Sequence, residues 1–120
     1  MKKYSTYFFD IDGTIFKYRL FESYKRTPPE VTTHAVEKLT MIKDAGHMII
    51  LTTARPEHLR DHTLHELKEN KVPFDSLIMG IGRGPRHLVN DLDPKVKTPR
   101  AIAWNVKRDS GLTDIQIDVV

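Results

Sequence analysis

Short apolar runs alternate with segments of helical periodicity along much of this chain, and this alternation restricts the fold more than any other feature. Residues 4–9, YSTYFF, have the aromatic and hydroxyl-rich composition of a strand, and residues 47–53, HMIILTT, form a continuous apolar run of the kind found in buried strands. Between them, residues 29–46 predict a helix that ends at Gly46 and has one apolar face, formed by Val31, Ala35, Leu39 and Ile42.

The same alternation continues beyond the second run. Residues 55–70 predict another helix, with Pro56 in its first turn and Leu64 and Leu67 facing inward. Further short strands are predicted at residues 74–80, 86–91 and 101–106. Residues 114–120 would form either an edge strand or a docking tail. A strand–helix–strand–helix–strand order is typical of an α/β protein whose parallel sheet is covered by helices.

Length and composition restrict the classes of protein to consider. The 120 residues suffice for one domain, residues 1–120, and the absence of cysteine excludes disulfides, thiolate chemistry and cysteine-bound zinc. A formal charge of +3 suits an anionic substrate but is too small to indicate nucleic-acid binding by itself. No apolar run has membrane-spanning length, and the N-terminus reaches Asp10 before a signal-type apolar segment can develop. We therefore expect a cytoplasmic protein.

Polar residues collect where the predicted strands end. Asp10 and Asp12 follow the first strand, Thr52 and Thr53 end the second, and Asp91 ends a later one. Ligands of parallel sheets bind beyond the carboxyl ends of the strands. Two carboxylates this close repel each other unless a cation lies between them, and Mg²⁺ accepts such oxygen ligands. The pattern therefore predicts a magnesium site.

Four motifs give the chain a resemblance to a known family. No P-loop, EF-hand loop or complete dinucleotide fingerprint is present. The segments FFDIDGT, MIILTTARP, GRGP and VNDLDP instead resemble, in order, the motifs of the haloacid-dehalogenase (HAD)-like phosphohydrolases. The TARP version of the second motif is similar to capsule-biosynthesis phosphatases and to polynucleotide 3′-phosphatase domains. The resemblance covers residues 4 to about 94.

The resemblance implies catalytic roles for residues of the first two motifs. Asp10 would attack phosphorus and form an aspartyl-phosphate. Asp12 would protonate the leaving oxygen, deprotonate the attacking water and offer its backbone carbonyl to Mg²⁺. Thr53 would hydrogen-bond a phosphate oxygen, in preference to Thr52. Thr52 and Gly13 are candidate substrate-binding residues.

The basic and acidic motifs leave alternatives open. Arg83 of GRGP is the first candidate for the basic residue of the third motif, followed by Arg86 and Lys71. Asp91 would be the third magnesium ligand, although Asn90 replaces an aspartate that relatives often carry and Asp93 would only support the site. Arg55 would either contact substrate or be a surface charge at the start of a helix.

The implied architecture is a Rossmann-like three-layer sandwich with a central, mostly parallel sheet and no cap domain. Residues 13–29 provide only a flap, so the open site could admit a large substrate or be closed by a neighbouring subunit of a homo-oligomer. Basic residues between Lys17 and Arg26 would be solvated or contact substrate, and Trp104 would be core. Two further groups are candidates. The histidines His58, His62 and His65 would be solvated or bind a transition metal, and the aromatic residues Tyr18, Phe21 and Tyr24 could stack on bases.

The sequence therefore predicts a magnesium-dependent phosphomonoester hydrolase. A small phosphorylated metabolite such as a sugar phosphate is the first substrate class. A nucleic-acid 3′-phosphate is the second, because Arg55 and the basic flap would suit a polyanion. The alternative from a different class is a catalytically silent binding protein with the same fold, suggested by Asn90 and by the absence of a clear lysine in the third motif.

Overall fold

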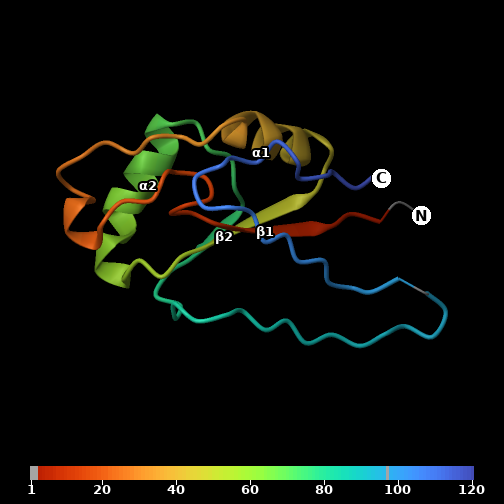
Figure 1. The fold of residues 1–120 in the computed structure, drawn as a ribbon. Coiled ribbons are helices and arrows are strands. Elements are labelled where there is room, and N and C mark those ends of the chain that lie inside the picture. The colour runs from red at the N-terminus through yellow and green to blue at the C-terminus, as the bar shows by residue number, and fades with distance from the viewer. Residues whose placement is uncertain (1–2, 97) are drawn as a thin grey trace.

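The computed structural model describes residues 3–96 and 98–120 and shows a parallel sheet with helices between its strands (Figure 1). The sheet has three strands in the order β1-β2-β3, so that β2 is central. The strands are β1 (Thr6–Asp10), β2 (Met48–Thr52) and β3 (Ser76–Ile78). The α-helices are α1 (Ala35–Asp44) and α2 (Arg60–Glu69), and two short 3₁₀ helices are η1 (Phe21–Ser23) and η2 (Glu57–Leu59). The Rossmann-like α/β class without a cap is confirmed.

The register of the strands brings their carboxyl ends to one edge of the sheet. Asp10 of β1 is paired with Thr52 of β2, and Thr52 is paired with Ile78 of β3. Just beyond β2, the Thr53 N–H donates to the Ile78 carbonyl at 2.9 Å. Side chains of paired residues lie on the same face of a sheet, so Asp10 and Thr52 are neighbours.

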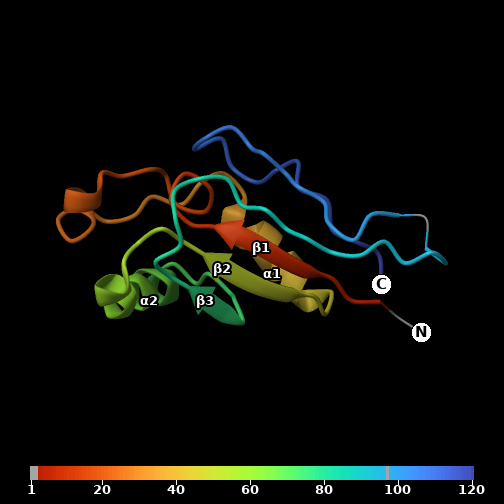
Figure 2. The same cartoon turned by 90° about the horizontal axis from the view of Figure 1, so that it is seen from below.

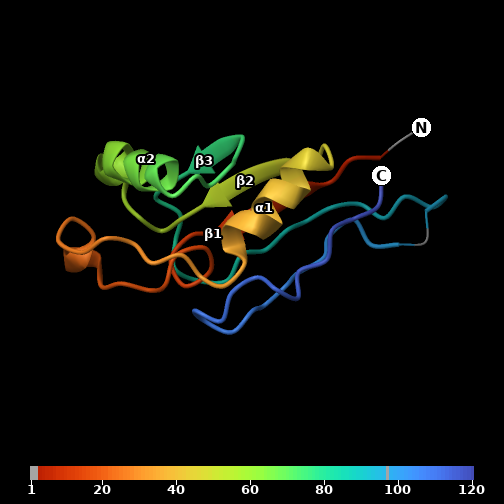
Figure 3. The same cartoon turned by 90° about the horizontal axis from the view of Figure 1, so that it is seen from above.

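One face of the sheet forms the core together with the helices. Alternate strand residues Phe9, Ile49, Leu51 and Leu77 are buried, as the two-residue period of a strand requires. They belong to one cluster with Leu39 and Ile42 of α1 and Leu67 of α2. Figure 3 shows α1 in front of β2, and the view from the other side in Figure 2 shows the strands in front of α1. The apolar side chains Phe8, Met48 and Ile78 are exposed.

Two predicted features near the helices were wrong. The first helix begins at Ala35 and not at Pro29, because Thr32 bonds back to the loop after β1 through its N–H to the Ile15 carbonyl (2.8 Å) and its hydroxyl to the Thr14 carbonyl (2.7 Å). The prediction that Leu64 faces inward also fails, since Leu64 is exposed while Thr63, Glu66 and Leu67 form the buried face of α2.

Residues 82–96 and 98–106, which we call the arm, run as an extended trace away from the helices (Figure 1). The strands predicted at residues 86–91 and 101–106 are absent, so these two predictions were wrong. The backbone of these stretches makes no ladder with β1, and Gly84, Pro85, Pro94 and Pro99 interrupt the arm. Trp104 is 44% exposed, which also contradicts its prediction as a core residue.

Residues 107–118, the C-terminal strap, return to the body of the protein. The Asp109 N–H donates to the Gly13 carbonyl at 2.8 Å, and the Leu112 N–H donates to the Thr33 carbonyl at 3.0 Å. The side chains of Leu112 and Ile115 are buried in the core cluster. Of the two alternatives for the C-terminal segment, the structure therefore shows a docked tail without strand pairing. Among the described residues, no helix combines the length and apolar character needed to cross a membrane.

Candidate active site

Asp10 lies at the carboxyl end of β1 with its side chain accessible to solvent. Partial burial raises the pKa of Asp10, and the negative charge of Asp12 acts in the same direction. The Ile11 N–H and the positive charges of Arg86 and Arg108 partly oppose this rise in the pKa. The first aspartate is thus an accessible carboxylate in the field of two arginines from distant parts of the chain.

Asp12 has a different environment, because its carboxylate is held by the guanidinium of Arg55. Arg55 Nε donates to Asp12 Oδ2 and Arg55 Nη2 donates to Asp12 Oδ1, both at 2.8 Å. The Tyr24 hydroxyl adds a third hydrogen bond to Oδ2 at 3.1 Å. The side chains of Asp12 and Arg55 are only 11% and 1% exposed. A bidentate arginine pair therefore compensates the charge of the second aspartate.

Arg55 is itself fixed by residues of α2 and of the flap. Its Nη1 donates to Glu66 Oε1 at 2.7 Å and to the Thr63 hydroxyl at 3.0 Å, and its guanidinium carbon lies 4.2 Å from the centre of the Tyr24 ring. Burial acts to lower the pKa of Arg55, but its hydrogen bonds with Asp12 and Glu66 outweigh burial and raise that pKa. The guanidinium is therefore a permanent, oriented cation.

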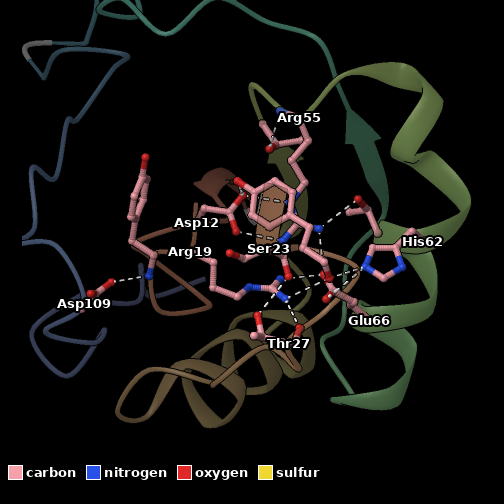
Figure 4. A network of polar contacts seen from close by, with 12 residues as sticks. Asp12, Arg19, Ser23, Thr27, Arg55, His62, Glu66 and Asp109 are labelled. Carbon is pink, nitrogen blue, oxygen red and sulfur yellow. Dashed lines mark hydrogen bonds and ion pairs between the residues drawn. The ribbon is translucent and has the colours of Figure 1, made fainter. Parts of the chain in front are cut away.

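Glu66 joins this arginine to a second one from the flap, as Figure 4 shows. Arg19 Nη2 donates to Glu66 Oε1 at 2.9 Å, and Arg19 Nη1 donates to the Thr27 carbonyl at 2.7 Å. Burial acts to raise the pKa of Glu66, but hydrogen bonds from Arg19 and Arg55 prevail and place that pKa below its ordinary value. Burial, with the charge of Asp12, also raises the pKa of Tyr24 to about 12. The flap is thus tied to the group that holds Asp12.

The two threonines after β2 have separate surroundings. Thr52 is the register partner of Asp10, whereas Thr53 is buried. The Thr53 hydroxyl accepts a hydrogen bond from the Arg55 N–H at 3.1 Å. Gly13 has a φ of +90°, and a side chain at this position would meet Arg108, with 3.3 Å between the added Cβ and Arg108 Cγ. Thr52 and Gly13 therefore border Asp10 and Asp12, respectively.

The structure also places the candidates for the basic residue. Arg86 is near enough to act on Asp10 electrostatically, and its Nη1 donates to the Gly84 carbonyl at 3.0 Å. Arg83 is exposed in the glycine-rich start of the arm. Lys71 lies just after α2, in a left-handed conformation with a φ of 57°. Of the three candidates for the basic residue of the third motif, Arg86 is thus the one whose charge acts on Asp10.

The acidic residues of the fourth motif lie on the arm, apart from the two aspartates of the first motif. Asp91 is 77% exposed and pairs with Arg100 at 3.0 Å, and Asp93 Oδ1 accepts from the Lys95 N–H at 2.9 Å. Asn90 is exposed. Within residues 3–96 and 98–120, no group of three histidine or acidic side chains is arranged to hold a metal ion. The structure does not bring Asp91 to Asp10.

Several residues of the site were not singled out by sequence reasoning. Glu66 is the charged residue of the buried stripe on α2, spaced three from Thr63 and one from Leu67, and this spacing was an available signal. For Tyr24 the sequence suggests only base stacking, and for His62 only solvation or metal binding. His62 Nε2 donates to the Tyr24 carbonyl at 2.8 Å. For Arg108, no local pattern of residues gave a signal.

The parallel α/β sheet and the order of the sequence motifs place the chain in the class of proteins with a HAD-like phosphatase fold. Within that class, the family description "PITM 1-3, LNS2 domain" matches residues 7–106, and the chain belongs to this LNS2 domain family. Membership of this family supports phosphohydrolase chemistry in general, but it identifies neither a substrate nor a metal ion. No curated protein and no solved structure matches the chain.

Proposed function

We propose that this protein is a phosphomonoester hydrolase that acts through an aspartyl-phosphate on Asp10. The observation that carries the proposal is the contrast between an accessible Asp10 and an Asp12 that Arg55 holds in place. A nucleophile must reach phosphorus, whereas an acid–base group must keep a fixed orientation beside it. The HAD-like fold of the family supports this assignment.

The first half of the reaction transfers the phosphoryl group to Asp10. An Asp10 carboxylate oxygen attacks phosphorus, the bond from phosphorus to the ester oxygen breaks, and that oxygen takes a proton from Asp12, which must enter this step as the carboxylic acid. Oδ2 of Asp12 already accepts two hydrogen bonds, from Arg55 and Tyr24, whereas Oδ1 accepts one, from Arg55. A carboxylate oxygen has about two acceptor sites, so Oδ1 is the atom available to carry the proton.

The second half of the reaction restores the enzyme. Asp12 Oδ1 removes a proton from water, the water oxygen attacks phosphorus, and the bond from phosphorus to Asp10 breaks, which releases phosphate. Arg86 offsets the negative charge on the transferred group throughout. The Arg55 clamp keeps Oδ1 on the same line of approach in both halves.

The residues around Asp10 could supply some, but not all, of the magnesium ligands that the sequence predicts. Mg²⁺ is commonly bound by one or two carboxylates together with substrate phosphate and water, so the accessible Asp10 carboxylate and the Asp12 backbone carbonyl would hold it. The carboxylate of Asp12 is engaged by Arg55, and Asp91 would have to approach from the arm to contribute. When bound, the ion would neutralise charge on the phosphoryl oxygens.

The test is phosphate release from an aryl phosphate, with and without magnesium. We expect the wild type to be active and Asp10→Asn to lose at least about 100-fold, because an amide is not an effective nucleophile. Asp44→Asn is the matched control, since Asp44 is exposed at the end of α1 and lies outside the site. Full activity of Asp10→Asn would disprove the mechanism.

For the substrate, we propose a small phosphorylated metabolite such as a sugar phosphate. The support is the similarity of TTARP and GRGP to the capsule-type pattern. In this structure Arg55 contacts Asp12, so its charge does not argue for a nucleic-acid 3′-phosphate. Sugar phosphates, nucleotides and 3′-phosphorylated oligonucleotides should be compared by kcat/KM at two salt concentrations. A more than tenfold preference for an oligonucleotide, lost in salt, would reverse the order of the two classes.

A phosphate-binding protein without turnover is the second candidate function. It is favoured by the pairing of Asp91 with Arg100 on the arm, since among the described residues no third acidic side chain joins Asp10 and Asp12 to form a metal-binding group. Beryllium fluoride distinguishes the two functions, because it forms a phosphate-like adduct on a nucleophilic aspartate. An adduct on Asp10 together with turnover supports the enzyme, whereas phosphate binding without adduct or turnover supports the binding protein.

A further inference from the structure

The C-terminal strap places a basic residue beside the first motif. The Asp109 N–H bonds to the Gly13 carbonyl, and Asp109 Oδ1 accepts from the Tyr18 N–H at 2.7 Å. Gly111, with a φ of +94°, lies so close to Thr33 that any side chain there would collide with the Thr33 backbone. The contacts of Asp109 and Gly111 therefore fix the course of the strap and the direction in which residue 108 departs from it.

Arg108 lies against the loop that follows β1. Its aliphatic stem occupies the space over Gly13, where an added Cβ would be 3.3 Å from Arg108 Cγ and 3.7 Å from Nε. Its guanidinium carbon is 4.1 Å from the centre of the Tyr18 ring. Stacking on an aromatic face orients the guanidinium plane and leaves its in-plane N–H groups for another partner. The residue is exposed, so an incoming ligand can reach these donors.

The charge of Arg108 acts on the proposed nucleophile. Arg86 and Arg108 both exert a favourable electrostatic effect on the Asp10 carboxylate. They come from different segments, the arm and the strap. A phosphomonoester brings up to two negative charges to a carboxylate that is itself an anion, so a second arginine lowers the repulsion that one arginine alone would leave.

We propose that Arg108 is a substrate-binding residue, whose guanidinium binds oxygens of the phosphoryl group over Asp10. The proposal rests on the proposed function for the identity of the ligand, a phosphate monoester. The planar fork of arginine matches two phosphate oxygens, and such charge-assisted pairs are strong. The family match ends at residue 106, so the family motifs do not include this residue.

Binding of inorganic phosphate, measured by calorimetry, tests the proposal without requiring turnover. We expect Arg108→Ala to bind phosphate about 10- to 100-fold more weakly than the wild type, the loss typical of a hydrogen-bonded charge. Arg108→Lys keeps the charge without the fork and should lie between the two. Lys107→Ala is the control, because it removes the same charge from the same strap and should bind like the wild type. Thermal unfolding of all variants verifies that the strap still docks.

Kinetics with an aryl phosphate separate binding from chemistry. A ligand contact present before reaction predicts a raised KM for Arg108→Ala, with kcat reduced less than KM is raised. Unchanged phosphate affinity in folded Arg108→Ala, or an equal loss in Lys107→Ala, would overturn the proposal. So would a wild type that does not bind phosphate. A wild type that binds phosphate through Arg108 but has no turnover would refute the proposed enzyme and leave this inference intact.

Discussion

Two segments that the sequence predicts as strands, Met48–Thr52 and residues 86–91, differ in the structure. The first is the central strand β2, paired on both sides and covered by α1. The second is an exposed part of the arm, in which Val89 is 93% exposed. An apolar run becomes a strand only where neighbouring strands satisfy its backbone groups and a second layer covers its side chains. The comparison divides the molecule into a packed body and an exposed arm.

The buried and the exposed ion pairs should give the largest difference between body and arm. We expect Arg55→Met to lower the free energy of unfolding by about 3–5 kcal/mol, because Asp12 and Glu66 would keep buried charges without their partner. Arg100→Met removes an exposed partner of Asp91 and should cost at most about 1 kcal/mol. Urea unfolding at pH 7 measures both values. Equal losses would mean that the arm is as well packed as the body.

Apolar truncations test the same division through packing. Ile49→Ala removes a fully buried side chain from β2 and should cost about 2–5 kcal/mol. Val89→Ala removes an exposed side chain from the arm and should change the stability by no more than about 0.5 kcal/mol. The free energies of unfolding in urea again give the comparison. A cost above about 2 kcal/mol for Val89→Ala would show that residues 86–91 pack in solution.

Low pH should reduce the stability of the packed body, because Glu66 becomes protonated. The pKa of Glu66 lies below its ordinary value of 4.5 in the folded protein, so its stabilisation is complete above that value and is lost as the pH falls through the folded-state pKa. Relative to the wild type, Glu66→Gln should therefore be less stable at pH 7, with a difference that shrinks below pH 4.5. Asp91→Asn on the arm should change the stability by less than about 0.5 kcal/mol at pH 7. A difference between Glu66→Gln and wild type that grows in acid would contradict this assignment.

The sequence predicted the parts of the fold and site that depend on local pattern. The strand ends at Asp10 and Thr52 and the order of β1, β2 and β3 with their helices follow from periodicity and from the motif spacing. The strands at residues 86–91 and 101–106 failed because strand formation also requires a partner, which no local pattern specifies. Helix α1 begins later than predicted because tertiary hydrogen bonds occupy Thr32.

The contacts within the site could not be predicted from local sequence patterns either. The pairing of Asp12 with Arg55 joins residues 43 apart in the sequence, and the bonds of Arg19 to Glu66 join residues 47 apart. A close pair of aspartates indicates that a cation is needed, but it does not say whether a metal or an arginine supplies it. Arg108 is more distant still from the first motif, and only the docking of the strap brings it there.

The strap has a consequence for the order in which the chain folds. Its hydrogen bonds join residues 91 apart at Tyr18 and Asp109 and 113 apart at Ser5 and Asp118, whereas the β1–α1–β2 unit is assembled from a much shorter stretch. Contacts of high sequence separation require more loop-closure entropy and tend to form slowly. We therefore expect the strap to close after the Asp12–Arg55 pair has formed, and to open first in local fluctuations of the native protein. Hydrogen exchange at Asp109 and Leu112 would then be faster than at β2, and each opening would withdraw Arg108 from Asp10 while the sheet stays folded.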